Sequence, residues 1–179
     1  MPANTFGCDF DWKASPFSLP STPSNLVSLE QIKGPNGTLV MFICNHYTYV
    51  LDVLNDIISG AHKLIAMGVG VVAISSNDAT AYPADSFEHM RRLALSENFP
   101  FHYLYDESQS VARAYGATFT PDFFGCNAHL ELNRGLINNK RERPSHAKHN
   151  LFDAMSLIRK TGKGPLVQHV SIGCSIKWK

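Results

Sequence analysis

One cysteine of this 179-residue chain, Cys44, stands where a thiol could do chemistry. It follows an apolar run at residues 39–43 and precedes a helical pattern that becomes regular at Val50. At a helix start, unpaired backbone N–H groups and the positive end of the helix dipole favour thiolate over thiol. The pKa of a free cysteine, near ~8.5, can fall to ~7 or below there. We therefore predict that Cys44 is a nucleophile with a lowered pKa, to which a protonated His46 would add positive charge. The alternative is an inert, buried thiol.

The other three cysteines are Cys8, Cys126 and Cys174. No two of the four have the spacing of a zinc knuckle or of a dithiol motif. In a reducing compartment we expect most of them to be free thiols. Cys126 lies in an apolar segment, which predicts a place in the core, whereas the sequence does not place Cys8.

The eight histidines do not predict a metal site. Only His146 and His149 are close enough in sequence to share a helix face. Two ligands do not make a closed metal site, so we predict neither a metal nor another cofactor.

Charge and hydropathy exclude several classes of partner. The formal net charge is +1, with basic residues spread along the chain, so we predict no nucleic-acid partner. No apolar stretch approaches the ~20 residues that span a bilayer, and no secretory signal is visible. We expect a cytoplasmic protein without a membrane partner; the oligomeric state is not predicted.

The hydrophobic pattern predicts alternating strands and helices. Strands are expected at residues 39–43, 69–75, 101–105 and 122–126, with 129–133 beside the last as a hairpin. Helices are expected at about 50–65, after Asp85, at 108–115 and at about 147–160. Asp85 and Glu88 have the spacing of a capping box.

These elements predict one α/β domain over residues 1–179, a mixed sheet with helices on both faces. Residues 1–37 would be an N-terminal extension of turns and short strands, and 161–179 an irregular tail. In such sheets ligands bind beyond the carboxyl ends of the strands, which is the place of Cys44.

Four segments resemble a thioredoxin-like family of the redoxin and alkyl hydroperoxide reductase/thiol-specific antioxidant group. They are FICNHYTYV at 42–50, ISSNDATAYPADS at 74–86, FPFHYLYDESQSVARAYGATFTPDFF at 99–124 and SIGCSIKWK at 171–179. The similarity covers most of residues 38–135 and the tail. It implies a thioredoxin-like fold and a redox or antioxidant activity on thiols, disulfides or peroxides.

The chain departs from that family at its centre. The family usually reads Cys-Asn-His-Cys-Pro-Tyr-Val, so Tyr47 replaces the second cysteine and Thr48 the proline. A phenol cannot attack a mixed disulfide as a second thiol does. Residues 136–150 also depart from the family. The resemblance makes Cys174 a candidate resolving thiol; the alternative is a structural or exposed thiol.

Thr120 and Pro121 resemble the cis-proline loop of thioredoxin-like folds. The resemblance implies a cis bond, and a loop that faces Cys44 and offers the Thr120 backbone to an extended peptide as an added strand. Asn45 and Tyr47 would contact the same substrate. The alternative is a simple proline at the start of a strand.

Three functions remain open from the sequence. The first is a redox protein acting through the single thiol of Cys44. The second is a degenerate thioredoxin fold that binds a partner without catalysis. The third is a one-cysteine peroxidase, although the peroxiredoxin pattern Pro-x-x-x-Thr-x-x-Cys is absent, since Gly37 and Met41 stand in its Pro and Thr places.

Overall fold

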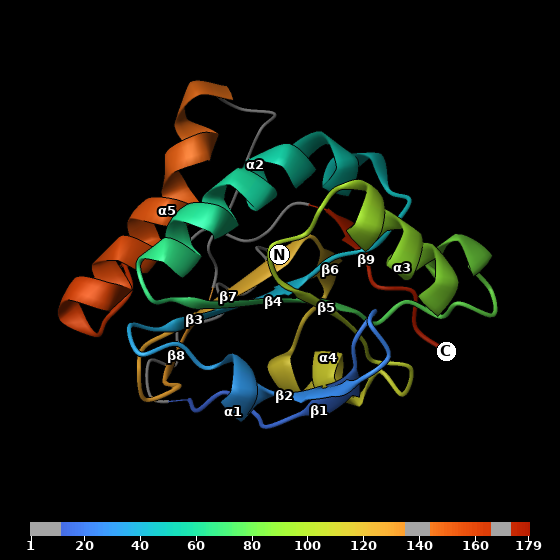
Figure 1. Ribbon diagram of the computed structural model, residues 1–179, viewed down its shortest axis with the longest axis horizontal. Helices are drawn as coiled ribbons and strands as arrows, with labels where there is room; N and C mark the ends of the chain where they lie inside the picture. Colours follow the sequence, from blue (N-terminus) through green and yellow to red (C-terminus); the bar gives the residue numbers. More distant parts are fainter. Residues whose placement is uncertain (1–11, 135–143, 166–172) are drawn as a thin grey trace, which may run out of the picture.

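A five-stranded mixed sheet forms the centre of the computed structural model, which describes residues 12–134, 144–165 and 173–179 (Figure 1). Its strands are β3 (Thr38–Phe42), β4 (Gly70–Ser75), β5 (His102–Tyr105), β7 (Asp122–Cys126) and β8 (Leu132–Arg134). They are ordered β5-β4-β3-β7-β8. The pairs β3–β4 and β4–β5 are parallel, whereas β3–β7 and β7–β8 are antiparallel. The predicted mixed sheet, α/β class and hairpin are confirmed.

The central strand β3 is buried along its whole length, as its unbroken apolar run predicted. Leu39 and Met41 pack into one hydrophobic cluster, and Val40 and Phe42 into the other. The two clusters lie on opposite faces of the sheet because side chains alternate along a strand. Both faces are therefore covered, and the end of β3 delivers Cys44 to the edge of the core.

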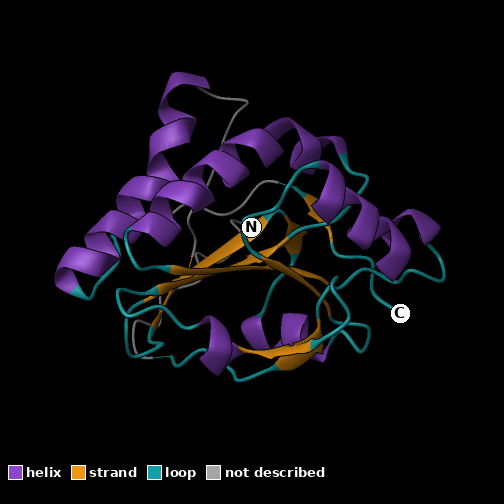
Figure 2. Ribbon diagram, in the orientation of Figure 1, coloured by secondary structure: helices purple, strands orange, loops and turns teal. Residues whose placement is uncertain are grey.

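Three helices cover one face: α2 (Thr48–Ala66), α3 (Phe87–Ser96) and α5 (Pro144–Thr161) (Figure 2). Ala154, Met155 and Ile158 of α5 are buried, and Leu151 is partly buried against the same cluster. The longest helix, α2, ends before Gly68, whose φ of 76° places it in the left-handed region that glycine tolerates. In the described part of the chain, no helix combines the length and the apolar character that crossing a bilayer requires.

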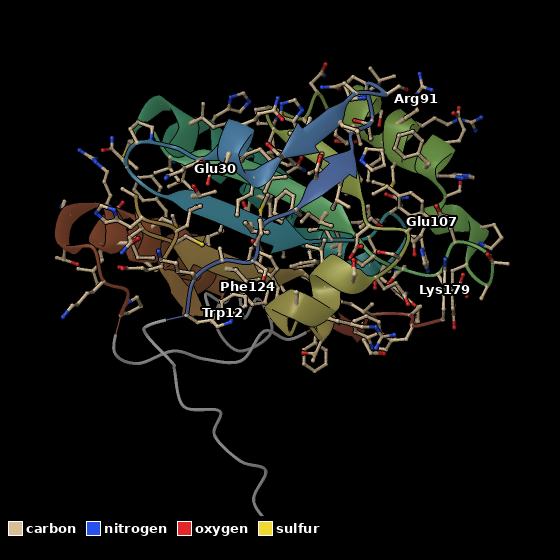
Figure 3. The ribbon with its side chains drawn as sticks, turned by 90° about the horizontal axis from the view of Figure 1, so that it is seen from below. Trp12, Glu30, Arg91, Glu107, Phe124 and Lys179 are labelled. Carbon is tan, nitrogen blue, oxygen red and sulfur yellow. The ribbon has the colours of Figure 1, made fainter. Side chains whose placement is uncertain are left out.

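The opposite face is covered by β1 (Ser18–Pro20), β2 (Leu26–Ser28), α1 (Leu29–Ile32) and α4 (Ser110–Tyr115). Tyr115 lies among four aromatic rings here, those of Trp12, Phe17, Phe42 and Phe124. Its centroid is 5.5 Å from that of Trp12, 5.7 Å from that of Phe42 and 5.6 Å from that of Phe124. Figure 3, which views the molecule from this side, labels Trp12 and Phe124.

Two local predictions were wrong. Asp85 does not cap α3: it ends the short 3₁₀ helix η1 (Pro83–Asp85), and the N-cap position belongs to Ser86, which makes no side-chain capping bond. The C-terminal tail is not irregular throughout. Cys174–Ser175 forms β9, which pairs antiparallel with β6 (Phe119–Thr120). The second correction concerns a pairing between segments distant in the sequence.

The remaining cysteine and histidine predictions have different outcomes. Cys126 is buried in β7, so its predicted place in the core is confirmed. Cys8 and His169, and the side chains of His146 and His149, lie outside the described residues. Within the described residues, no group of three or more potential metal ligands comes together.

Candidate redox site around Cys44

Cys44 lies in the loop between β3 and α2, a few residues before the helix begins. The N-cap of α2 is Tyr47, so the helix starts at Thr48 rather than at Cys44 itself. The sulfur nevertheless faces donors: the Thr120 hydroxyl lies 3.2 Å away, and the backbone N–H groups of Tyr47 and His46 also donate to it. Three hydrogen bonds to one sulfur would stabilise its ionised form.

Burial outweighs these donors. The exposed fraction of Cys44 is 0%. Desolvation, with a smaller contribution from the Asp85 carboxylate, raises the pKa of its thiol to about 11 although the Thr120, Tyr47 and His46 donors oppose the rise. The predicted lowering of the Cys44 pKa is therefore wrong for this arrangement. The sequence showed the donors near a helix start, but it did not show that other segments close over the sulfur.

Asp85 is the buried charge of the site, and the sequence did not predict this role. Its Oδ1 accepts the backbone N–H of Asn45 at 2.8 Å, and its Oδ2 accepts Nδ2 of Asn77 at 2.7 Å. Its exposed fraction is 0%. Charged hydrogen bonds of this kind are among the stronger ones in proteins, so the carboxylate fixes the backbone directly after Cys44.

The side chains that follow Cys44 are held by separate contacts. Asn45 accepts the hydroxyl of Tyr103 at 2.9 Å and donates to the carbonyl of Ala84 at 3.0 Å. Nδ1 of His46 lies 3.0 Å from Oδ1 of Asp85 but is not aligned for a hydrogen bond with it. The His46 ring lies 4.2 Å from that of Tyr47, centroid to centroid. The loop is thus anchored through Asn45 and Asp85.

The strand edge next to Cys44 is already paired within the chain. The Thr120–Pro121 peptide bond is cis. Thr120 lies directly opposite Cys174 in the β6–β9 ribbon, and the N–H of Ile176 donates to the carbonyl of Thr118 at 3.0 Å. The edge that was expected to receive an extended peptide is therefore occupied by the protein's own tail.

The pairing also sets the direction of the Cys174 side chain. Residues directly opposite in an antiparallel pair project to the same face, with Cβ atoms about 5 Å apart. Since the Thr120 hydroxyl reaches the sulfur of Cys44, Cys174 projects to the face of the ribbon that looks toward Cys44. Both cysteines are free thiols, and Cys174 is partly exposed.

Buried amides hold the rest of the tail. The N–H of Lys177 donates to Oδ1 of Asn77 at 2.9 Å, and its carbonyl accepts Nε2 of Gln109 at 2.8 Å. The N–H of Lys179 donates to Oε1 of Gln109 at 2.9 Å. Figure 3 shows Lys179 on the same side of the molecule as Glu107, which precedes α4. These contacts involve backbone atoms of the tail, so they fix its path regardless of its side chains.

Side chains of the tail add contacts at the surface. The Lys177 ammonium lies 5.2 Å from the ring centroid of Tyr47 and 5.7 Å from that of Tyr82. A hydrogen bond to Tyr47 raises the pKa of Lys177. The guanidinium of Arg113 lies 4.4 Å from the ring centroid of Trp178. Exposed cation–π contacts are worth about 0.5–1 kcal/mol each, so they supplement the buried amide bonds.

A comparison with protein families agrees with this site and fold. The model of the AhpC/TSA family matches residues 11–140. The chain belongs to the AhpC/TSA family. No curated protein sequence matches it.

Solved structures similar to this AhpC/TSA protein fall into two groups. An uncharacterized conserved protein from Geobacillus kaustophilus is 38% identical, with a TM-score of 0.90, over 100% of this chain and 97% of that one. A hypothetical protein from Sinorhizobium meliloti 1021 is 34% identical, with a TM-score of 0.84, over 99% and 97%. The thioredoxin domain of a thiol-disulfide oxidoreductase from Bacteroides vulgatus is 13% identical, with a TM-score of 0.58, over 70% and 86%, and shows the shared fold alone.

The thioredoxin-like fold of this AhpC/TSA protein brings together most of the predicted residues. Thr120 contacts the sulfur of Cys44, Cys174 lies opposite Thr120, and Tyr47 donates its N–H to the sulfur. Their roles remain predictions. The residues whose roles sequence reasoning missed are Asp85, Asn77 and Gln109. The first two lie in the segment 74–86 and the third in the segment 99–124; both segments carried part of the resemblance, without a role assigned to these residues.

Proposed function

We propose that this chain is a thiol–disulfide redox protein in which Cys44 is the nucleophile and Cys174 resolves the intermediate. Its membership of the AhpC/TSA family supports a thioredoxin-like redox function. The observation that carries the assignment of residues is the Thr120 hydroxyl, which contacts the sulfur of Cys44 while Thr120 pairs directly with Cys174.

The proposed reaction is two successive thiol–disulfide exchanges. The Cys44 thiolate attacks one sulfur of a disulfide, the substrate S–S bond breaks, and one half leaves as a thiolate that takes a proton from water. The Cys174 thiolate then attacks the Cys44 sulfur of the mixed disulfide and expels the second half. The substrate gains two electrons, Cys44 and Cys174 form a disulfide, and an external dithiol returns both to thiols.

The reaction requires the tail to move away from Thr120 first, because the sulfur of Cys44 is buried in the structure in which the tail pairs with β6. The Thr120 hydroxyl has one hydrogen, and its oxygen lies within hydrogen-bond distance both of the Cys44 sulfur, at 3.2 Å, and of the Cys174 carbonyl, at 3.4 Å. Release of the tail would leave that hydrogen to the sulfur alone and admit water. Both effects would lower the Cys44 pKa toward the ordinary range.

Oxidised glutathione tests the proposal. The reduced protein is treated with it, quenched at intervals and examined by intact-mass spectrometry. We expect the wild type to pass through a glutathione adduct on Cys44 to a Cys44–Cys174 disulfide, and Cys174→Ser to stop at the adduct. Cys126→Ser is the matched control, because Cys126 is a buried core thiol. An adduct that never forms on Cys44, or that Cys174→Ser clears as fast as the wild type, would refute the assignment.

A second candidate is a binding protein without catalysis. The observation that favours it is the buried thiol of Cys44, whose pKa burial raises. This function predicts that Cys44→Ala leaves capture of partners intact and that the wild type gains no glutathione adduct. Formation of the adduct followed by its resolution would remove this candidate.

A further inference from the structure

The side chain of Asn77 lies between the C-terminal tail and the loop that carries Cys44. Its Oδ1 accepts the N–H of Lys177 at 2.9 Å, and its Nδ2 donates to Oδ2 of Asp85 at 2.7 Å. The other oxygen of Asp85 accepts the N–H of Asn45 at 2.8 Å. Three hydrogen bonds in series therefore join the backbone of the tail to the residue directly after Cys44.

Both side chains in this series are buried. The exposed fraction is 2% for Asn77 and 0% for Asp85. Water cannot readily replace a partner that leaves, so loss of one hydrogen bond leaves a buried polar atom unpaired. Each bond in the series is therefore sensitive to whether the next is formed.

A second contact joins the same two segments from the other side. The Thr120 hydroxyl lies beside both the Cys44 sulfur and the Cys174 carbonyl. Gly173 passes so close to Thr120 that a Cβ built there would lie 2.3 Å from the Thr120 carbonyl oxygen. The tail thus contacts the surroundings of Cys44 in β9, at Thr120, and again beyond β9, where Lys177 bonds Asn77.

We infer that Asn77 and Asp85 are positioning residues, which transmit docking of the C-terminal tail to the Cys44–Asn45 backbone and so keep Cys44 in its sealed arrangement. The relevance of this connection to turnover rests on the proposed function. The tail has two states, paired with β6 or released from it. The series of hydrogen bonds makes the position of the Cys44–Asn45 backbone depend on which state the tail is in.

A pair of substitutions at one position separates this series from the other contacts of the tail. Lys177→Pro removes the N–H that Asn77 accepts, and it also removes the ammonium that lies over Tyr47 and Tyr82. Lys177→Ala removes the same ammonium but keeps the N–H. The comparison of the two variants therefore cancels the loss of the ammonium and leaves the lost hydrogen bond to Asn77 together with the backbone restriction that proline imposes. Both changes lie near the chain end at a partly exposed side chain, directly after Ile176, which is buried in one of the two hydrophobic clusters.

The readouts are the alkylation rate of Cys44 by iodoacetamide and the amide hydrogen exchange of Asn45, followed by mass spectrometry and NMR. We expect Lys177→Pro to increase both about tenfold over Lys177→Ala, the factor that loss of ~1.4 kcal/mol of docking free energy gives. Lys177→Ala should stay within about threefold of the wild type. Thermal unfolding of both variants verifies that the core is intact.

The inference is overturned if Lys177→Pro speeds exchange of the tail amides while Asn45 and Cys44 stay at wild-type rates. It is also overturned if the two variants behave alike. Asn77→Leu, of similar size, gives an independent measurement. It should increase the amide exchange of Asn45 and the alkylation rate of Cys44 as Lys177→Pro does, and unchanged rates would contradict the positioning role of Asn77.

Failure of the proposed function is distinguishable from failure of this inference. Suppose that Lys177→Pro increases the alkylation rate of Cys44, but Cys174→Ser clears the glutathione adduct as fast as the wild type. The positioning role of Asn77 and Asp85 then stands, and the assignment of Cys174 as the resolving thiol is refuted. If the adduct requires Cys174 for clearance but Lys177→Pro changes nothing, the redox assignment stands and the positioning role falls.

Discussion

The hydroxyl of Thr120 donates to the sulfur of Cys44 across 3.2 Å, although the two residues are 76 positions apart in the chain. This contact lies where the end of β3 meets the β6–β9 ribbon, so it joins the core sheet to the C-terminal tail. Its donor stabilises a thiolate, whereas the burial that accompanies it disfavours one. The chemistry of Cys44 depends on which of these effects prevails as the tail moves.

The first prediction concerns the pH dependence of Cys44 alkylation. Burial disfavours the charged thiolate and raises the pKa to about 11, so at pH 7 only ~0.01% of the thiol is ionised. The rate with iodoacetamide should increase about tenfold per pH unit and flatten only near the raised pKa. The urea-unfolded protein, measured alongside, should flatten near ~8.5. A folded-state profile that flattens below the unfolded one would contradict the dominance of burial.

The second prediction is that Thr120→Val lowers the alkylation rate of the Cys44 thiol. Valine keeps the branched shape but removes the hydroxyl that lowers the Cys44 pKa, so the pKa should rise further. A hydrogen bond to a charged group is worth about 1.5–3 kcal/mol, so at fixed pH the alkylation rate should fall at least about tenfold. Mass spectrometry of the alkylated protein measures it. Thr118→Val is the matched control, since the side chain of Thr118 is exposed; equal rates in both variants would count against the contact.

The third prediction concerns the close approach of the tail at Gly173. An added Cβ would meet the Thr120 carbonyl oxygen at 2.3 Å, so Gly173→Ala cannot keep the β6–β9 pairing unchanged. Amide exchange at Ile176 and Lys177 should accelerate about tenfold or more, as expected when a buried hydrogen bond of ~1.4 kcal/mol is lost. Cys44 should become accessible to alkylation.

Gly60→Ala is the control for Gly173→Ala. A Cβ at Gly60 meets no atom within 4 Å, and the residue lies inside α2. This change should leave tail exchange unaltered and stabilise the protein by about 0.5–1 kcal/mol, because alanine favours a helix interior over glycine. Wild-type tail protection in Gly173→Ala would show that the tail docks without the close contact.

The sequence predicted the sheet well because the relevant signals are local. The run at residues 39–43 is apolar without a break, and only a strand covered on both faces suits it, as β3 shows. The helix over Val50 to Ile65 has a regular apolar face, and α2 forms there. Such patterns depend on residues within one element, so they survive without knowledge of the rest of the fold.

The site was less predictable because its decisive contacts are long-range. Asp85 and Glu88 have the local spacing of a capping box, yet Asp85 instead bonds the N–H of Asn45, 40 residues away, and Asn77. The tail is too short to signal a strand by itself and pairs only because β6 offers an edge. Cys44 is buried in a cluster that includes Met90, Tyr103 and Phe123, which are distant in the sequence, so the local sequence around Cys44 could not predict its raised pKa.

The fourth prediction connects the core to the Cys44 loop through Tyr103. This residue is buried in β5, and its hydroxyl donates to Oδ1 of Asn45 at 2.9 Å. Tyr103→Phe removes that donor and should lower the free energy of unfolding by about 1 kcal/mol, because Asn45 is partly exposed and water can replace part of the bond. Urea denaturation measures the loss. Tyr82→Phe is the matched control: Tyr82 is 38% exposed, so its change should stay within about 0.5 kcal/mol. If the two variants are equally stable, the Tyr103–Asn45 hydrogen bond does not anchor the loop.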